Sequence, residues 1–232
     1  MAKIVPVLPP AAKRIGKILQ ALDRAYPNAA CSLHYTNPLE LLIATILSAQ
    51  CTDALVNKVT PALFTRYRTA AQYARAPLEE LERAVSKVNF YRNKAKSITL
   101  ACQAIVERFH GAVPNRMEDL VSLHGVARKT ANVVLGNAFG ISSGIVVDTH
   151  VMRLSQRLAL SAHTDRDNIE QDLIRLVPQP RWTTFGHQMI QHGRAICKAA
   201  SPKCCECPIG ASLCPAYRDE RSDPPTTPAS HR

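Results

Sequence analysis

Residues 123–135 read LHGVARKTANVVL, a glycine turn followed by two cations and an apolar run. Apolar side chains recur at helical spacing from Val126 to Ala138, which predicts a helix over about residues 126–139. The chain enters this helix through the turn at Gly125, because glycine is favoured where the backbone bends tightly. The stretch therefore predicts a turn that leads directly into a buried helix.

The same helical spacing recurs along the rest of the chain, and strand-like runs are nearly absent. A short apolar run at residues 144–147, GIVV, leads straight into a helix start at Asp148, so we expect a buried extended link there. Prolines fall between the periodic segments or in their first turns, where a missing N–H group is tolerated. We therefore predict an all-α fold. The periodic segments are residues 11–26, 38–50, 53–67, 77–88, 93–109, 166–177 and 183–197.

The chain is strongly basic. Its 232 residues carry 29 Lys and Arg against 18 Asp and Glu, a formal charge of +11, which favours a polyanionic partner such as nucleic acid. The N-terminus lacks the apolar stretch of a secretion signal, and no later run is long and uncharged enough to cross a bilayer. We therefore expect a soluble, cytoplasmic protein that does not bind membranes.

Five of the eight cysteines lie in residues 197–214, CKAASPKCCECPIGASLC. Disulfides are not expected in a reducing cytoplasm, and thiolates that converge from one short loop repel one another unless a cation-rich centre binds them. Zinc usually takes two close pairs of cysteines, whereas this loop has one CxxC flanked by single cysteines. Iron–sulfur clusters accept more varied spacings, so the pattern slightly favours a cluster over zinc. The four candidate ligands are Cys197, Cys204, Cys207 and Cys214.

Lys129 has no acidic residue three or four positions away on its helix, so no carboxylate offsets its charge there. Two uses of the side chain remain open. It can contact a phosphate as a point charge, or it can act as an amine nucleophile in a cleft that lowers its pKa. Asp148 precedes Thr149 and an apolar-periodic helix, which is an ordinary N-cap position.

Three motifs in this order, LHGVARKTANVVL, VVDTH and HGRAICKAASPKCCECPIGASLC, make the chain similar to the endonuclease III family of DNA glycosylases. The likeness runs from about Ile15 to Tyr217. It implies two helical lobes with the active site between them: a six-helix lobe at residues 35–140 with a helix-hairpin-helix, and a lobe of residues 1–34 and 141–218 with a structural [4Fe-4S] cluster on the four cysteines. Residues 219–232 are polar and proline-rich, and we expect them to be disordered.

The resemblance also implies the reaction, which is removal of oxidised pyrimidines from duplex DNA and β-elimination at the abasic site. Lys129 stands where the family has its nucleophilic lysine, and Asp148 where it has its catalytic carboxylate. A free lysine, with a pKa of about 10.4, is protonated at neutral pH, so attack at the sugar needs a desolvated site with nearby cations. The hairpin and helix start at Gly125, Ala127, Arg128 and Thr130 would contact DNA phosphates.

Two further positions correspond to residues that fill the gap left by a flipped nucleotide. Gln50 ends an apolar helix, and its amide could pair with an orphaned base. Phe90 is the expected wedge, although an ordinary core position is nearly as compatible with the sequence. Arg92 and Lys94 would lie along the DNA backbone, and a solvated helix face is the alternative for both.

The sequence departs from the family pattern in the hairpin, where His124 and Ala127 replace the usual proline and second glycine. If residue 127 needs a positive φ, alanine costs about 1 kcal/mol there. The Cys207–Cys214 interval and the Lys129–Asp148 interval are each one residue longer than usual, and Cys205 is an additional thiol.

Two other functions remain possible from the sequence. A catalytically silent DNA-binding module would use the hairpin only for phosphate contact, but the presence of both Lys129 and Asp148 argues against it. A mismatch adenine glycosylase lacks the nucleophilic lysine and carries a further C-terminal domain, for which this chain is too short. We expect the protein to act as a monomer on duplex DNA that contains damaged or abasic nucleotides.

Overall fold

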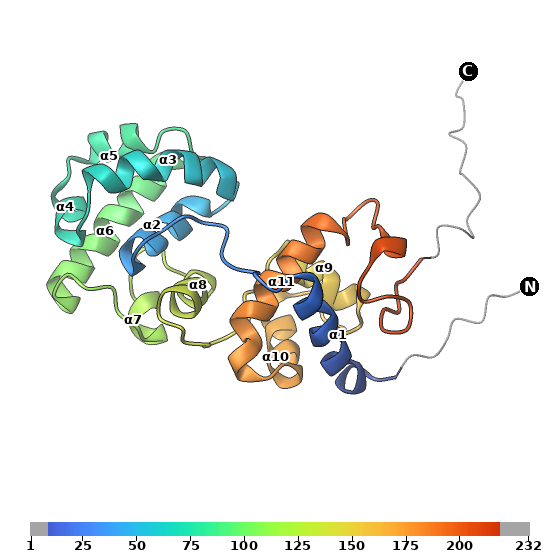
Figure 1. Cartoon of the computed structure of the whole chain (residues 1–232). Coiled ribbons are helices and arrows are strands. Elements are labelled where there is room, and N and C mark those ends of the chain that lie inside the picture. Colours follow the sequence, from blue (N-terminus) through green and yellow to red (C-terminus); the bar gives the residue numbers. More distant parts are fainter. Residues whose placement is uncertain (1–8, 219–232) are drawn as a thin grey trace, which may run out of the picture. The chain divides into compact units, whose positions relative to one another are not determined.

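The computed structural model describes residues 9–218, so the predicted disordered tail at 219–232 lies outside the described residues. Within 9–218 the chain is all-α, as predicted, and contains no strand (Figure 1). No helix in this range is both long and apolar enough to cross a bilayer. The helices are α1 (Ala11–Ala25), α2 (Pro38–Ser48), α3 (Asp53–Arg66), α4 (Ala70–Arg75), α5 (Leu78–Ala84), α6 (Tyr91–Phe109), α7 (Met117–Val121), α8 (Arg128–Ala138), α9 (Thr149–Arg157), α10 (Arg166–Leu176) and α11 (Trp182–Ala195), with short 3-10 turns at Gln179–Arg181 and Cys204–Glu206.

The chain divides into two compact units. Residues 30–146 form one of them, and residues 1–29 together with 147–232 form the other. The expected six-helix lobe at 35–140 falls inside the first unit, which contains α2 to α8. The functional assignment of the two lobes stays a prediction.

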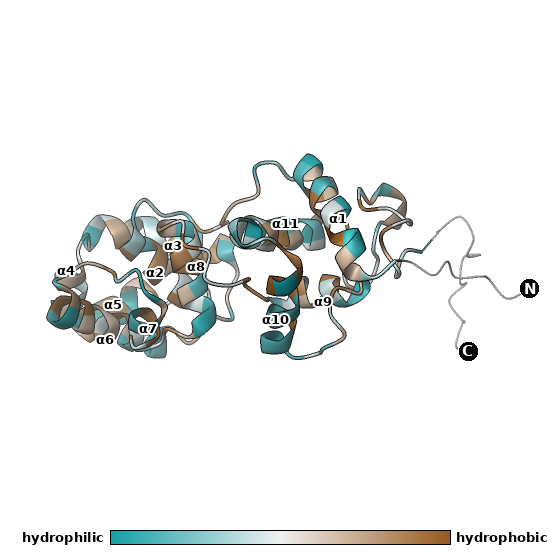
Figure 2. Cartoon of the chain, turned by 90° about the horizontal axis from the view of Figure 1, so that it is seen from below, coloured by the Kyte–Doolittle hydropathy of each residue, from teal (hydrophilic) through white to brown (hydrophobic). Residues whose placement is uncertain are grey.

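The unit of residues 30–146 is built around α2. Every residue from Leu41 to Leu47 is buried, and a helix that is apolar on all sides must be enclosed by its neighbours. Helices α3, α6 and α8 pack against it, and Figure 2 shows the apolar residues of α2 beside those of α8. The helix starts cleanly because the Asn37 side chain accepts a hydrogen bond from the Glu40 N–H and Pro38 occupies the first turn. Helix α2 therefore positions the other helices of this unit.

A tight turn joins α7 to α8, as the sequence predicts. Gly125 has φ +77°, and a Cβ atom on it would lie 2.7 Å from the Cβ atom of Ser97 on α6. The position therefore demands glycine for two reasons, the left-handed backbone and the close approach of a neighbouring helix. Val126 is buried beside the turn, and its N–H donates to the Leu123 carbonyl.

Alanine at position 127, where the family usually has glycine, does not strain the hairpin. Ala127 has φ −86° and ψ 167° and is the N-cap residue of α8. These angles belong to the extended region that any residue adopts. The expected penalty of about 1 kcal/mol for a left-handed alanine is therefore absent.

The unit of residues 1–29 and 147–232 combines helix α1 with helices α9, α10 and α11. Helix α11 packs against α1 and α9, and α10 packs against α1 and α9. Arg14 of α1 is 3% exposed and donates hydrogen bonds to the carbonyl oxygens of Leu158 and Leu213, at 2.9 and 2.6 Å. It therefore ties α1 both to the end of α9 and to the loop before the last cysteine. The predicted extended link at 144–147 leads into α9 without forming a strand.

We predict that Gly125→Ala destabilises the protein, because it places a side chain in a left-handed turn and forces Ser97 to move. The left-handed backbone alone costs about 1–2 kcal/mol, and urea unfolding should show a loss of at least this size. Gly16→Ala is the matched control: Gly16 lies in α1, where an added Cβ meets nothing within 4 Å, and alanine is the better helix residue. Equal unfolding midpoints for Gly125→Ala and the parent would contradict the prediction.

Candidate active site and metal centre

Lys129 is the second residue of α8, directly after the hairpin. Helix α8 has no side-chain N-cap, so its first-turn N–H groups and partial positive charge remain available to an anion. Gly125, Ala127 and Arg128 are exposed around this helix start, and Thr130 is half-buried. The structure thus gathers the predicted phosphate-binding residues at one helix N-terminus.

The side chain of Lys129 is exposed. The residues of its own helix therefore do not provide the desolvated site that the proposed amine nucleophile needs. Val133, one turn further along α8, is partly buried and packs against the core. Asn132 is buried, and its Oδ1 atom accepts a hydrogen bond of 2.8 Å from Ser143. On this side of α8, Asn132 is therefore enclosed, whereas Lys129 is exposed.

Asp148 is the N-cap residue of α9, as predicted from the sequence. Its Oδ1 atom accepts hydrogen bonds from the N–H groups of His150 and Val151, both at 2.8 Å. The cap fixes the side chain and uses only one of the two carboxylate oxygens. Asp148 and Lys129 belong to different units of the chain.

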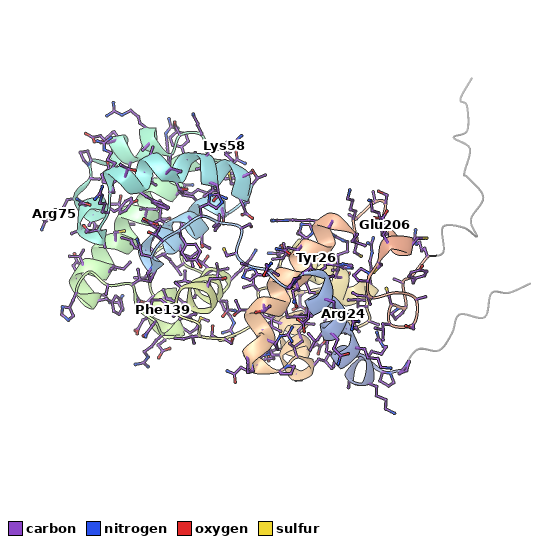
Figure 3. All side chains as sticks on the ribbon, in the orientation of Figure 1. Arg24, Tyr26, Lys58, Arg75, Phe139 and Glu206 are labelled. Carbon is purple, nitrogen blue, oxygen red and sulfur yellow. The ribbon has the colours of Figure 1, made fainter. Side chains whose placement is uncertain are left out.

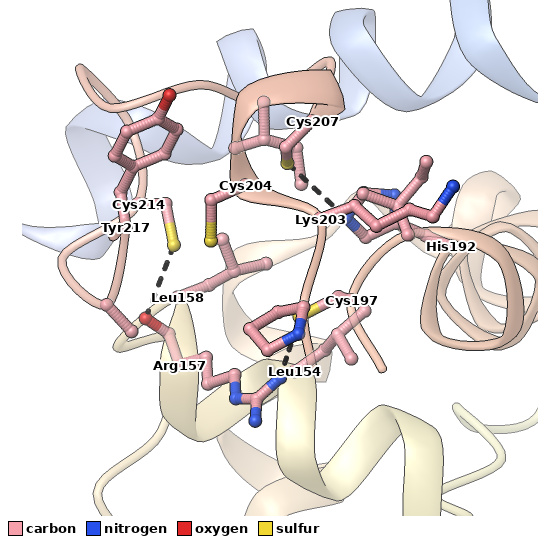
Figure 4. A pocket seen from close by; sticks show the side chains of 14 residues that line it. Leu154, Arg157, Leu158, His192, Cys197, Lys203, Cys204, Cys207, Cys214 and Tyr217 are labelled. Carbon is pink, nitrogen blue, oxygen red and sulfur yellow. Dashed lines mark hydrogen bonds between the residues drawn. The ribbon is translucent and has the colours of Figure 1, made fainter. Parts of the chain in front are cut away.

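The four predicted metal ligands line one cavity. Its volume is about 420 Å³, which includes space open to solvent, and Figure 4 shows the sulfur atoms of Cys197, Cys204, Cys207 and Cys214 around it. Within residues 9–218, no three His, Cys, Asp or Glu side chains converge closely enough to hold a single metal ion. The sulfurs therefore surround a space instead of meeting at one point. Cys205 is exposed and does not line the cavity.

Burial and the neighbouring thiols make two of the four cysteines, Cys207 and Cys214, hard to ionise. Burial, followed by the charges of Cys207, Cys197 and Cys204, raises the pKa of Cys214 to about 11. Burial likewise raises the pKa of Cys207. Thiolate ligands at this site thus require a cationic centre that compensates both effects.

Side chains outside the cysteine loop also contact the sulfurs, and no sequence motif marks them. Arg157 of α9 donates a hydrogen bond of 3.2 Å from Nη1 to Cys197 Sγ. His192 of α11 lies with Nε2 3.6 Å from Cys207 Sγ and with Nδ1 3.0 Å from the Tyr26 hydroxyl. Tyr26, labelled in Figure 3, directly follows α1. These contacts join residues up to 166 positions apart, so no local pattern could reveal them.

Burial lowers the pKa of His192 to about 4, so its imidazole is neutral at physiological pH. A neutral imidazole has one donor and one acceptor nitrogen. When the Tyr26 hydroxyl donates to Nδ1, Nε2 carries the proton and can donate to the Cys207 sulfur. Arg157 thus donates to one of the four sulfurs, and His192 donates to a second one in this tautomer.

The two predicted gap-filling residues both lie on exposed turns. Gln50 is exposed with φ 52°, and Phe90 is 60% exposed with φ 56°. The exposure of Phe90 rules out the alternative that it is an ordinary core residue. Arg92 is also exposed, with its guanidinium over the Tyr91 ring.

The structure contradicts the prediction that Lys94 contacts the DNA backbone. Lys94 is only 6% exposed, and its Nζ atom donates to the Leu47 carbonyl at 2.8 Å. Burial lowers the pKa of this ammonium group. Its position on the inner side of α6 follows from the helical period, because Lys94 shares that side with the buried residues Ala95 and Ile98.

Comparison with known proteins agrees with the fold and the motifs. The model of the HhH-GPD superfamily of base excision DNA repair proteins matches residues 43–179. Endonuclease III of Synechocystis is 56% identical over 88% of this chain and 93% of its own length. The chain belongs to the endonuclease III family. Endonuclease III of Bacillus subtilis is 46% identical over 87% of this chain and 92% of its own.

Solved structures extend the comparison to the backbone. A trapped endonuclease III–DNA covalent intermediate and a non-covalent endonuclease III–DNA complex each match with a TM-score of 0.83 and 45% identity, over 89% of this chain and 96% of theirs. A thermostable thymine-DNA glycosylase shares the fold at 20% identity and a TM-score of 0.79. As a member of the endonuclease III family, the protein is a DNA glycosylase and abasic-site lyase of base excision repair.

We predict that Asp148→Ala lowers the free energy of unfolding by about 1 kcal/mol, since it removes the N-cap of α9. Asp148→Ser should be close to the parent, because serine caps a helix as well as aspartate does. Thermal unfolding of the two variants under identical conditions tests this. Equal stability of Asp148→Ala and Asp148→Ser would show that the two hydrogen bonds to Asp148 do not stabilise the helix.

Proposed function

We propose that Lys129 and Asp148 carry out the glycosylase and lyase reactions on oxidised pyrimidines in duplex DNA, with the protein acting as a monomer. The observation that carries this proposal is the position of Lys129 in the first turn of α8, directly after the hairpin, in a chain of this family. The formal charge of +11 supports duplex DNA as the partner. The solved complexes of endonuclease III with DNA support the same substrate.

The hairpin and the start of α8 bind a phosphate of the damaged strand. Backbone N–H groups at the uncapped helix start donate to the phosphate oxygens, and the helix dipole favours their charge. Arg128 adds a side-chain cation at the same place. These contacts carry no sequence information, which suits an enzyme that must find lesions in any sequence.

The Nζ atom of Lys129 attacks C1′ of the flipped nucleotide, and the glycosidic bond breaks as the damaged base leaves with its electron pair. Loss of a proton from nitrogen and opening of the sugar ring give a Schiff base between Lys129 and C1′. The Schiff base acidifies the C2′ hydrogen, so its removal expels the 3′ phosphate and nicks the strand. A solved endonuclease III–DNA covalent intermediate supports this covalent route.

Asp148 contributes a fixed carboxylate. Its cap bonds end on Oδ1, which leaves Oδ2 to accept a proton from the attacking amine or to stabilise positive charge on the sugar. Because Lys129 is exposed in the free protein, bound DNA completes its surroundings and removes water from the amine. Substrate binding and activation of the nucleophile are then the same event.

We further propose that Cys197, Cys204, Cys207 and Cys214 hold a [4Fe-4S] cluster. A single tetrahedral zinc would need all four sulfurs about 2.3 Å from one point, whereas here they surround a cavity without converging. The donor set of four cysteines suits an iron–sulfur cluster, and hydrogen bonds from Arg157 and His192 suit its anionic sulfurs. The cluster supplies structure to the loop and takes no part in bond breaking.

We expect Lys129→Gln to abolish covalent trapping, because glutamine cannot form a Schiff base. The measurement is borohydride reduction of the protein on a duplex with an abasic site, followed by denaturing electrophoresis. Lys58→Gln is the matched control, since it removes one exposed cation from α3. Asp148→Ser, which keeps the helix cap, should slow base removal about 100-fold or more. Tight binding by the parent protein without any trapping would refute the proposed chemistry.

The cysteine loop offers a test with adjacent residues. Cys204→Ser should lose bound iron and the broad visible absorption of the cluster, because it removes a ligand. Cys205→Ser should retain both, because Cys205 is exposed and lies outside the cavity. Metal analysis that finds stoichiometric zinc and no iron in protein purified under anaerobic conditions would contradict the cluster assignment.

A further inference from the structure

Two exposed turns in the unit of residues 30–146 carry the proposed gap-filling side chains. Gln50 lies between α2 and α3, and Phe90 directly precedes α6. Both residues have left-handed backbone angles, with φ 52° and 56°, which cost an L-residue about 1–2 kcal/mol. Such angles persist only where the surroundings hold them, so the contacts of these turns are informative.

Asn89 connects the two turns directly. Its side-chain Nδ2 atom donates a hydrogen bond of 2.9 Å to the backbone carbonyl of Gln50. The donor is therefore the residue next to Phe90, and the acceptor belongs to Gln50 itself. This bond joins Asn89 to Gln50 across 39 positions of sequence and so fixes the distance between the two left-handed residues.

Lys94 makes a second connection between the two turns, from the buried side of α6. Its ammonium donates to the carbonyl of Leu47 in the last turn of α2, at 2.8 Å. Helix C-terminal carbonyls lack partners within the helix, and a cation is favoured there. The N–H of Lys94 also donates to the Phe90 carbonyl at 3.1 Å. Lys94 thus holds the end of α2, which leads to Gln50, against the start of α6, which follows Phe90.

We propose that Asn89 and Lys94 are positioning residues that hold Gln50 and Phe90 at a fixed separation for insertion into DNA. The inference rests on the proposed function and, in addition, on the role that the family resemblance predicts for these two side chains, which is to fill the gap left by the flipped nucleotide. Because the gap has a set size, a small error in the separation of the two wedges weakens the flipped state. The buried Lys94, which is withdrawn from the phosphates, gains a role in this arrangement.

Asn89→Ala tests the proposal, since Asn89 is exposed and its loss leaves the core intact. The substrate is a duplex with a tetrahydrofuran abasic analogue beside 2-aminopurine, whose fluorescence rises when the base unstacks. We expect Asn89→Ala to reduce affinity for this duplex about 5-fold, the equivalent of one hydrogen bond, and to reduce the fluorescence rise. Affinity for the undamaged duplex should stay unchanged.

Asn93→Ala is the matched control, because Asn93 is exposed in the first turn of α6, only four residues away. A double-mutant cycle adds a readout that general destabilisation would not produce. If Asn89 acts by positioning the wedges, the loss from Asn89→Ala should be smaller in a Gln50→Ala background than in the parent. Circular dichroism melting of every variant confirms that all are folded.

The possible results distinguish a failure of the proposed function from a failure of the positioning role alone. A parent protein that does not distinguish the abasic duplex from the undamaged one overturns the proposed function and the positioning role together. A parent that distinguishes them while Asn89→Ala behaves identically overturns the positioning role alone. Equal losses in Asn89→Ala and Asn93→Ala, or full additivity with Gln50→Ala, also overturn it.

Discussion

The enclosure of α2 is the constraint on which the unit of residues 30–146 depends. The seven consecutive residues Leu41–Leu47 are all buried, so this part of the helix has no face exposed to water. Helices α3, α6 and α8 must therefore pack around it, and each of them carries or follows a proposed functional residue. Gln50 lies between α2 and α3, Phe90 directly precedes α6, and Lys129 is the second residue of α8. The hydrophobic effect thus determines where the residues proposed to contact DNA lie in this unit.

Much of this could be predicted from local patterns. The helix after Gly125, the N-cap at Asp148 and the all-α class each depend on residues within a few positions of one another, and the structure confirms all three. The unstrained backbone of Ala127 could not be foreseen, because the residue type alone does not say which position of a turn has a positive φ. Local sequence patterns thus predict secondary structure better than they predict which residues from distant segments come into contact.

The errors and omissions concern contacts between distant segments. Lys94 was predicted to be a surface cation because lysine usually is one, but its ammonium group donates a hydrogen bond to the Leu47 carbonyl inside the unit. Arg157 of α9 and His192 of α11 contact the cysteine sulfurs, and Tyr26, at the end of α1, contacts His192. The residues that flank these three in the sequence do not indicate the contacts, because the packing of whole helices determines them.

The junction made by Arg14 has a consequence for the order of events during synthesis. This residue joins α1 to carbonyls of Leu158 and Leu213, so its partners leave the ribosome long after it does. At about 5–20 residues per second, α1 waits on the order of ten seconds or more for them, while residues 30–146 already form a closed unit. Helix α1 is therefore synthesised before the other helices but packs among the last. Its hydrogen bond to the carbonyl of Leu213, in the cysteine loop, is the last of these contacts to form.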